Sequence, residues 1–241
     1  MPQTTKIEWA DASWNPVTGC TKVSAGCKNC YAEKIARRLN KMGLPKYENG
    51  FEVMLHPVTL NEPTKMKKGK VIFVNSMSDL FHEDVPLSFI IKVFDVMNKT
   101  PQHSYLILTK RSDRLKEIDS KLNWSDNIWM GVTVEDTNNE YRIKDLEQCS
   151  ARIKFVSFEP LLGPIDTNSI DGIDWAIVGG ESGRGARPIE ESWINDIKDA
   201  CHIKKIPFYF KQWGGINKKK NGRLLNGQTW DDRPISKRLM Y

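Results

Sequence analysis

The chain has 241 residues, a net charge of +6, 39% hydrophobic residues and 10% aromatic residues. This composition excludes a disordered or fibrous protein, and no window approaches the roughly 18 unbroken apolar residues of a membrane span. The sequence starts Met-Pro-Gln-Thr-Thr-Lys, without the basic stretch and apolar run of a secretory signal, so we expect a cytoplasmic protein with no membrane partner.

In chain order, the first strand is expected within residues 7–18, and residues 31–42 predict a helix because apolar residues recur there at helical spacing. Residues 43–70, with their Pro and Lys content, predict an irregular segment. After them, short apolar runs indicate buried strands: KVIFVNS, SYLILTK, NIWMGVTV, RIKFVSFE, DWAIVGG and PFYFKQW. Further helices are expected between these runs, at residues 86–98, 112–121, 138–148 and 190–204.

The apolar runs show little alternation between polar and apolar residues, which is typical of parallel strands covered on both faces. Strands that alternate with helices imply βαβ units. We therefore predict an α/β fold with an incomplete (β/α) barrel of about six to seven parallel strands, with an open doubly wound sheet as the alternative. We expect residues 1–241 to form a single domain with a basic, loosely packed tail from about residue 217.

Polar residues terminate each predicted strand, and in both architectures these carboxyl ends share one edge where active sites form. Ser112 and Asn138 are the exceptions, since we interpret them as helix N-caps. The remaining strand-end residues, with His82 close behind the second strand, are Asn75, Ser76, Ser78, Asp79, Thr109, Lys110, Arg111, Thr133, Glu135, Asp136, Ser157, Glu159, Gly179, Gly180, Glu181, Ser182, Lys211, Gln212 and Trp213.

Two of these strand ends carry specific expectations. Glu159 lies between Phe158 and Pro160, where a buried carboxylate needs a cation or a donor, and Lys110 is a candidate partner. The segment VGGESGRGARP matches neither a dinucleotide fingerprint nor a phosphate-binding loop, although its glycines allow a ligand to approach the backbone closely. Arg184 and Arg187 of this segment could meet a phosphate or carboxylate.

Three cysteines, Cys20, Cys27 and Cys30, lie within eleven residues of the loop between the first strand and the first helix. In a reducing compartment, such a cluster indicates metal or redox chemistry more often than disulfides. Cys149 and Cys201 lie on helical patterns and are expected to be buried small hydrophobic residues.

The number of clustered thiols leaves two metal interpretations open. A cubane iron-sulfur cluster has four irons, so three thiolates leave one iron open to a substrate or cofactor. A structural zinc ion normally has four protein ligands, so zinc would need a distant ligand such as His82 or Asp79.

The loop in front of an incomplete barrel resembles the radical S-adenosylmethionine superfamily, in which the open iron holds the amino and carboxylate groups of that cofactor. Six residues separate Cys20 from Cys27, where the superfamily commonly has three. Over nearly the whole chain, seven blocks resemble the phage-associated three-cysteine-motif family of unknown function, often encoded beside a dedicated partner protein: WNPVTGCTKVSAGCKNCYAE, VNSMSDLFHEDVP, LTKRSDRL, GVTVED, FVSFEPLLGPI, VGGESGRGARP and FYFKQWG. The order of blocks is also similar, more weakly, to spore photoproduct lyase, which repairs a DNA lesion by radical chemistry.

These resemblances imply a radical enzyme in which Cys20, Cys27 and Cys30 hold a [4Fe-4S] cluster and S-adenosylmethionine is the cofactor. A reductant such as flavodoxin or ferredoxin would be needed. The implied cofactor contacts are Asn75, Ser76, Ser78, Asp79, Glu159, Gly179, Gly180 and Glu181, and Lys110 and Glu159 are the catalytic candidates. DNA or RNA is the implied substrate, with Lys110, Arg184, Arg187 and Lys211 as residues that could hold it. The alternative is a non-catalytic nucleic-acid-binding module stabilised by zinc or a cluster.

Overall fold

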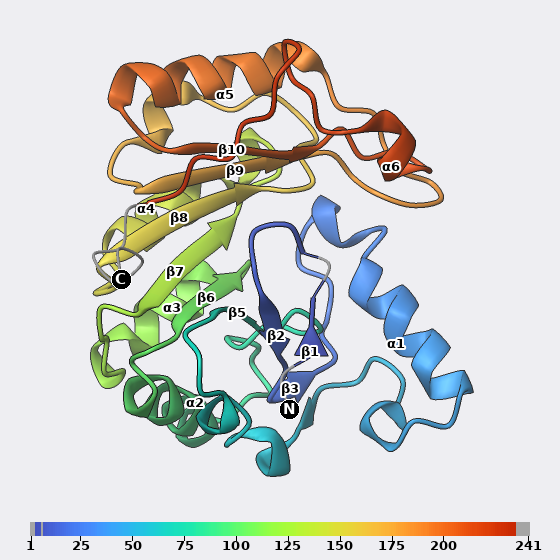
Figure 1. The fold of residues 1–241 in the computed structure, drawn as a ribbon, viewed down its shortest axis with the longest axis vertical. Helices are drawn as coiled ribbons and strands as arrows, with labels where there is room; N and C mark the ends of the chain where they lie inside the picture. Colours follow the sequence, from blue (N-terminus) through green and yellow to red (C-terminus); the bar gives the residue numbers. More distant parts are fainter. Residues whose placement is uncertain (1–2, 6, 235–241) are drawn as a thin grey trace.

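The computed structural model describes residues 3–5 and 7–234, and its centre is a parallel sheet (Figure 1). The seven parallel strands are β2 (Ala12–Trp14), β5 (Val71–Val74), β6 (Ser104–Thr109), β7 (Ile128–Thr133), β8 (Ile153–Phe158), β9 (Trp175–Gly179) and β10 (Phe208–Gln212). They lie side by side in chain order, and β1 (Gln3–Thr4) adds an antiparallel strand beside β2. The sheet ends at β1 and β10 without closing, so the prediction of an incomplete (β/α) barrel is confirmed. A doubly wound sheet is excluded because its strand order would reverse.

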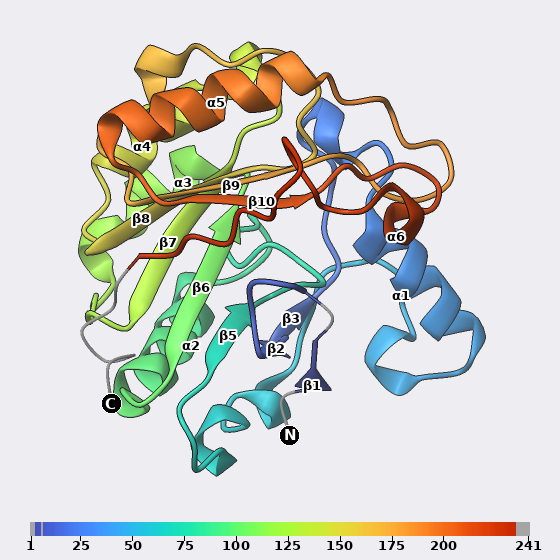
Figure 2. The same ribbon diagram turned by 45° about the horizontal axis from the view of Figure 1, so that its top comes forward.

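Helices α2 to α5 cover the outer face of the sheet, whereas α1 lies apart from them, beyond β1 and β2 (Figures 1 and 2). The α-helices are α1 (Tyr31–Lys41), α2 (Leu87–Lys99), α3 (Ser112–Ile118), α4 (Tyr141–Glu147), α5 (Glu191–Lys204) and α6 (Lys218–Asn221). Seven short 3₁₀ turns join these elements: η1 (Ala25–Cys27), η2 (Pro45–Tyr47), η3 (Pro57–Thr59), η4 (Pro63–Lys65), η5 (Asp119–Lys121), η6 (Thr137–Asn139) and η7 (Thr167–Ile170). No helix within residues 3–5 and 7–234 is long and apolar enough to cross a membrane.

The N-terminal region differs most from the prediction. The single strand expected within residues 7–18 is two strands, β2 and β3 (Val17–Thr18), and β3 pairs with β4 (Met54–Leu55) in a separate two-stranded sheet. The break falls at Asn15 and Pro16, and a proline interrupts strand pairing because it has no backbone N–H to donate. β1 was not predicted.

Both predicted N-caps were wrong. The Ser112 hydroxyl does not cap α3 but donates to Asp145 of α4 at 2.7 Å. The cap near Asn138 is Asp136, whose side chain accepts from the Asn138 backbone N–H at 3.0 Å. The chain there makes the turn η6 first, so α4 begins later than expected.

The two faces of the sheet bury different residues. The outer face packs aliphatic side chains under α2 to α5, including the buried, free Cys149 and Cys201 as predicted. The inner face carries a second cluster, rich in aromatic rings: Trp9, Val71, Phe73, Leu106, Trp129, Phe155, Trp175, Ile177 and Tyr209. Because side chains alternate along a strand, the polar residues two and four positions later face the same interior. The aromatic cluster is therefore the floor beneath the carboxyl-end residues.

The described part of the expected tail packs against the last strand. The backbone N–H of Phe210 donates to the Trp230 carbonyl, and that of Asp232 donates to the Phe208 carbonyl. The indole of Trp175 also reaches the Asp232 carbonyl at 2.8 Å. Residues 235–241 of that tail lie outside the described residues.

Candidate functional site

The cysteine loop runs across the carboxyl ends of the parallel strands, as expected. Gly19 bridges to Ser78 behind β5, and its backbone N–H donates to the Met77 carbonyl at 3.0 Å. Gly19 has a φ of 82°, and a Cβ there would lie 1.9 Å from the Glu52 carbonyl oxygen, so this entry to the loop requires glycine. Cys20, Cys27 and Cys30 are free and partly exposed.

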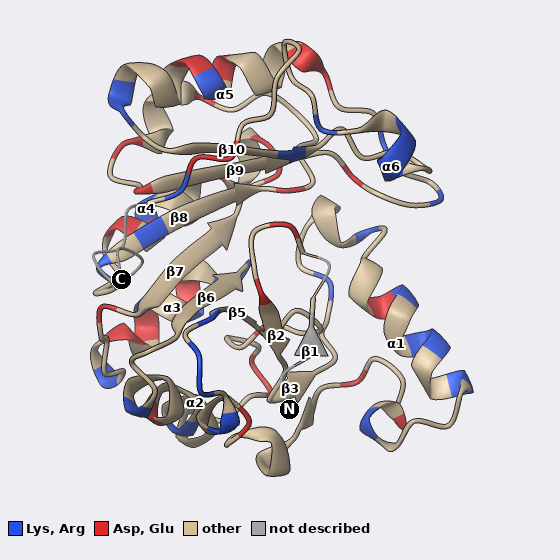
Figure 3. Cartoon of the chain, viewed as in Figure 1, with Lys and Arg blue, Asp and Glu red and all other residues tan. Residues whose placement is uncertain are grey.

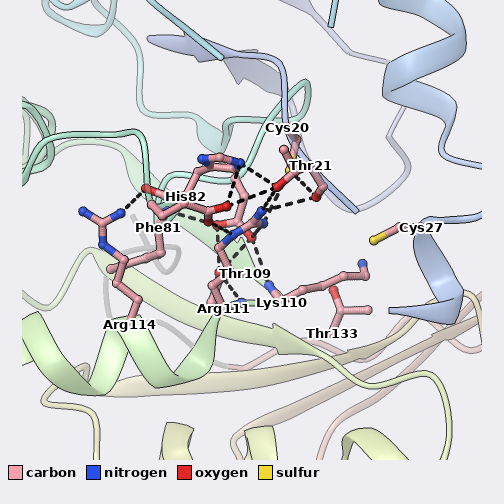
Figure 4. Close-up of polar contacts among 12 residues, drawn as sticks. Cys20, Thr21, Cys27, Phe81, His82, Thr109, Lys110, Arg111, Arg114 and Thr133 are labelled. Carbon is pink, nitrogen blue, oxygen red and sulfur yellow. Dashed lines mark hydrogen bonds and ion pairs between the residues drawn. The ribbon is translucent and has the colours of Figure 1, made fainter. Parts of the chain in front are cut away.

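Arg111, just after β6, makes the first attachment of the loop (Figure 4). Its guanidinium donates to Cys20 Sγ at 3.5 Å, to the Thr21 carbonyl at 3.2 Å and to Thr21 Oγ1 at 2.8 Å. The same group pairs with Asp79 at 3.3 Å and Glu83 at 2.9 Å. Burial and then Asp79 raise the pKa of the Cys20 thiol to about 11, although Arg111 opposes this shift. Metal binding at Cys20 would therefore release a proton.

Asp79, a predicted cofactor contact, is buried and already used inside the protein. Its oxygens accept from the Thr109 hydroxyl at 2.7 and 2.9 Å, from the backbone N–H groups of Phe81 and Lys110, and from Arg111. These bonds join the end of β5 to the end of β6. Asp79 therefore positions Arg111, and its hydrogen-bonding capacity is occupied.

Glu135, two residues beyond β7, makes the second attachment. Its carboxylate is fully buried, accepts from the Ser24 hydroxyl at 2.6 Å and pairs with Arg142 of α4 at 2.9 Å. Lys110 Nζ lies 3.9 Å from the same carboxylate. A Cβ on Gly26 would lie 2.3 Å from Glu135 Oε1, so the loop backbone packs directly on this side chain.

Glu181, at the end of β9, makes the third attachment. Its carboxylate accepts two side-chain bonds from Arg187 at 2.6 and 3.0 Å and one from Asn29 at 2.9 Å. Arg187 also donates to the Ala25 carbonyl at 3.0 Å, which ties the glycine-rich segment to the cysteine loop. Burial alone would raise the pKa of Glu181, but the bonds from Arg187 and Asn29 outweigh it and lower that pKa to about 2.

Glu159 pairs with Lys211 across the inner face, not with Lys110 as expected. Lys211 Nζ lies 2.9 Å from Glu159 Oε1, and the Ser157 hydroxyl donates to the other carboxylate oxygen at 3.2 Å. Burial acts to lower the pKa of Lys211, and the Glu159 charge more than reverses this effect. The correction has a simple cause, since Lys110 is held on the β7 side by Glu135.

The residues after β5 support the loop from below. Asn75 is buried with a φ of 58°, and its Oδ1 accepts from the Val17 backbone N–H at 3.3 Å. Ser78 donates to the Val17 carbonyl at 2.9 Å, and the Tyr31 hydroxyl donates to the Ser76 carbonyl at 2.6 Å. The Asn75 amide nitrogen has no partner in the described part of the chain, so one buried donor remains for a ligand.

Gly179 and Gly180 serve close packing of the protein itself. A Cβ on Gly179 would lie 2.6 Å from Glu159 Oε1, and one on Gly180 would lie 2.1 Å from the Trp213 carbonyl oxygen. Glycine is therefore required at both positions by the neighbouring strands, independently of any ligand.

Comparison with known proteins now adds to this geometry. The family described as "Protein of unknown function (DUF5131)" matches residues 4–234. The chain belongs to this family. No curated protein matches this DUF5131 chain.

Solved structures of spore photoproduct lyase share the fold of this DUF5131 chain. Its complex with dinucleoside spore photoproduct has a TM-score of 0.51 at 10% identity and covers 83% of this chain and 63% of that one. A cysteine-to-serine mutant has a TM-score of 0.55 at 10% identity, with coverages of 88% and 78%. A double mutant with bound AdoMet and dinucleoside spore photoproduct has a TM-score of 0.51 at 10% identity. The chain thus spans less than two thirds of the first of these structures, and at this identity the likeness concerns the fold alone.

A single metal ion fits the cysteine loop of the DUF5131 chain poorly. Within the described ranges, no three His, Cys, Asp or Glu side chains are grouped to hold one ion. Both distant zinc ligands considered from the sequence are occupied, because His82 Nε2 lies 2.8 Å from Thr21 Oγ1 and Asp79 holds Arg111. A cluster with several irons binds each thiolate at a different iron, so it does not need the three sulfurs to meet at one point. The thiolate-only donor set also suits iron-sulfur chemistry.

Sequence reasoning identified the strand ends but not all of their partners. Arg142 was missed because it lies on the apolar face of α4, where the pattern shows only a charged residue in a helix. Ser24 and Asn29 were also missed, although their places between the cysteines could have marked them. Arg184 was proposed beside Arg187, but Arg184 is exposed and only its backbone carbonyl is used, by Lys34 at 3.4 Å.

Proposed function

We propose that this chain is a radical S-adenosylmethionine enzyme in which Cys20, Cys27 and Cys30 hold a [4Fe-4S] cluster. The observation that supports it best is a loop of three free cysteines fixed over the carboxyl ends of an incomplete (β/α) barrel. The fold shared with spore photoproduct lyase, one structure of which contains AdoMet, supports the same function.

When bound, the cluster and cofactor would supply a 5′-deoxyadenosyl radical by one-electron reductive cleavage, with flavodoxin or ferredoxin as the class of reductant. The chain's own residues would position this chemistry. Arg111, Glu135 and the Glu181–Arg187 pair orient the loop, while Asn75 and the backbone of Ser76 and Gly179 border the space where the cofactor would lie. Lys110 and Glu159, beneath them on the inner face, are our candidates for contact with the substrate.

We further propose that the substrate is nucleic acid and that residues 1–241 act as one domain. The net charge of +6 favours an anionic partner, and the spore photoproduct lyase structures contain a dinucleoside lesion. Repair or modification of a base would then be the type of reaction.

The rival function is a non-catalytic nucleic-acid-binding module in which a metal merely fixes the loop. The hydrogen bonds from Arg111, Glu135, Glu181 and Arg187 argue against it, because they already fix the loop without a metal. The rival requires a large loss of thermal stability when Cys27 is replaced, whereas our proposal requires a small one.

Anaerobic reconstitution with iron and sulfide tests the proposal. We expect an EPR signal from the reduced protein that changes when S-adenosylmethionine is added, and 5′-deoxyadenosine as a product. Cys27→Ala should lose this signal, while Cys149→Ala, which removes a buried thiol outside the loop, should keep it. One zinc per chain with no cluster after reconstitution would overturn the proposal and favour the binding module.

A further inference from the structure

The charges at the carboxyl ends of the strands balance one another. Each cation there lies within ion-pair distance of a carboxylate: Lys110 and Arg142 beside Glu135, Arg111 beside Asp79 and Glu83, Arg187 beside Glu181, and Lys211 beside Glu159. These are five cations and five carboxylates. A phosphate entering this interior would have to approach the carboxylates of Glu135 and Glu159, which repel it.

A neutral, planar group suits this interior better. The side chains of Lys110, Lys211 and Glu159 are 22%, 18% and 13% exposed, so a ligand can reach them. Their ammonium groups donate and the carboxylate accepts, which matches the mixed donor and acceptor edge of a nucleobase. The aromatic cluster of the inner face lies beneath them.

Unpaired cations are found instead on the surface around the cysteine loop. We define the basic rim as Lys28, Arg184, Lys219 and Lys220, all of which are exposed. No carboxylate of residues 3–5 and 7–234 forms an ion pair with any of the four. Figure 3 shows basic residues on α6 and along α1. Residues 182–189 and 213–230 contain no Asp or Glu, so the rim is uniformly positive there.

The segments that carry the basic rim are adjacent to one another. The Asn29 amide donates to the Gly185 carbonyl at 2.9 Å, which places the cysteine loop beside the segment of Arg184. The backbone N–H of Gly183 donates to the Gly215 carbonyl at 2.9 Å, which places that segment beside the chain leading to α6. A strand of phosphates can therefore pass along the rim from Lys28 to Lys220.

We propose that the basic rim binds the phosphates of a nucleic-acid strand while a single unstacked base enters the charge-balanced interior between Lys110 and Lys211. This inference rests on the proposed function and deepens it, because it assigns the reaction to a base and not to the sugar-phosphate backbone. Cationic surfaces bind phosphates with a strong salt dependence, whereas a base held by hydrogen bonds and stacking adds affinity that salt hardly affects. The two parts can therefore be measured separately.

Fluorescence anisotropy of the full chain with short labelled single strands of DNA and of RNA tests the inference. We expect Lys219→Gln with Lys220→Gln to reduce the slope of log affinity against log salt by about 1.4 to 1.8 for at least one strand. Lys67→Gln with Lys68→Gln is the matched control, because these two lysines are also exposed but precede β5 at the opposite end of the sheet. An unchanged slope in the rim variant, or an equal reduction in the control, would overturn the basic rim.

A strand of the same length built from abasic units tests the interior. The abasic strand should keep the salt slope of the normal strand but bind about tenfold more weakly. Lys211→Gln should narrow this difference without changing the slope. Equal binding of the two strands, or a slope that falls by about 1 in Lys211→Gln, would overturn the entry of a base. The assay needs no cofactor or turnover, so normal binding without 5′-deoxyadenosine formation would refute the proposed reaction alone.

Discussion

Replacing Glu135 by alanine tests how the fold supports the cysteine loop. Glu135 is 0% exposed and its partner Arg142 is 1% exposed, with 2.9 Å between their charged groups. The substitution leaves the Arg142 charge buried without its partner and removes the acceptor of the Ser24 hydroxyl. Breaking a buried pair from one side costs about 3 to 5 kcal/mol. That loss is a large part of the roughly 5 to 15 kcal/mol by which domains are stable.

Urea unfolding followed by tryptophan fluorescence measures this loss, and the melting temperature should fall by about 2 to 4 °C for each kcal/mol. Asp126→Ala is the matched control, because its pair with Arg152 is short, 2.6 Å, but both side chains are more than half exposed. The control should lose less than about 1 kcal/mol. Glu135→Ala combined with Arg142→Met should recover much of the loss, since no buried charge remains. A Glu135→Ala variant as stable as the control, or a double variant no more stable than Glu135→Ala, would refute the reasoning.

Two further predictions concern β9. Because the pKa of Glu181 is lowered from 4.5 to about 2 by Arg187, the wild type should lose stability as the pH falls through this range, and Glu181→Gln should lack that part of the loss in urea titrations at acidic pH; parallel curves for the two proteins would contradict this. Gly180→Ala should lower the free energy of unfolding by about 1 to 3 kcal/mol because its Cβ would lie 2.1 Å from the Trp213 carbonyl oxygen. Gly163→Ala, whose Cβ would lie 3.2 Å from the nearest atom, is the control and should lose clearly less in the same denaturation assay.

Local sequence patterns were sufficient to predict the elements of the sheet. The apolar runs from Lys70 onward match β5 to β10 to within one or two residues, because a buried parallel strand needs a continuous apolar run bounded by polar residues. The N-terminal strand was harder to predict, since β2 and β3 are short and Pro16 separates them. The helix N-caps failed because Ser112 has a tertiary partner, Asp145, which no local rule can show.

The sequence by itself determined that three cysteines and a set of polar strand ends would share one edge of an incomplete barrel. Only the tertiary structure decided which charged groups face one another. Ser24 and Glu135 are 111 residues apart, and Glu159 pairs with Lys211 of β10 while the expected partner, Lys110, faces Glu135. The strand period fixes the face on which a side chain lies, but the partner across that face depends on the order and curvature of the strands. That arrangement fixes the cysteine loop and balances the charges beneath it.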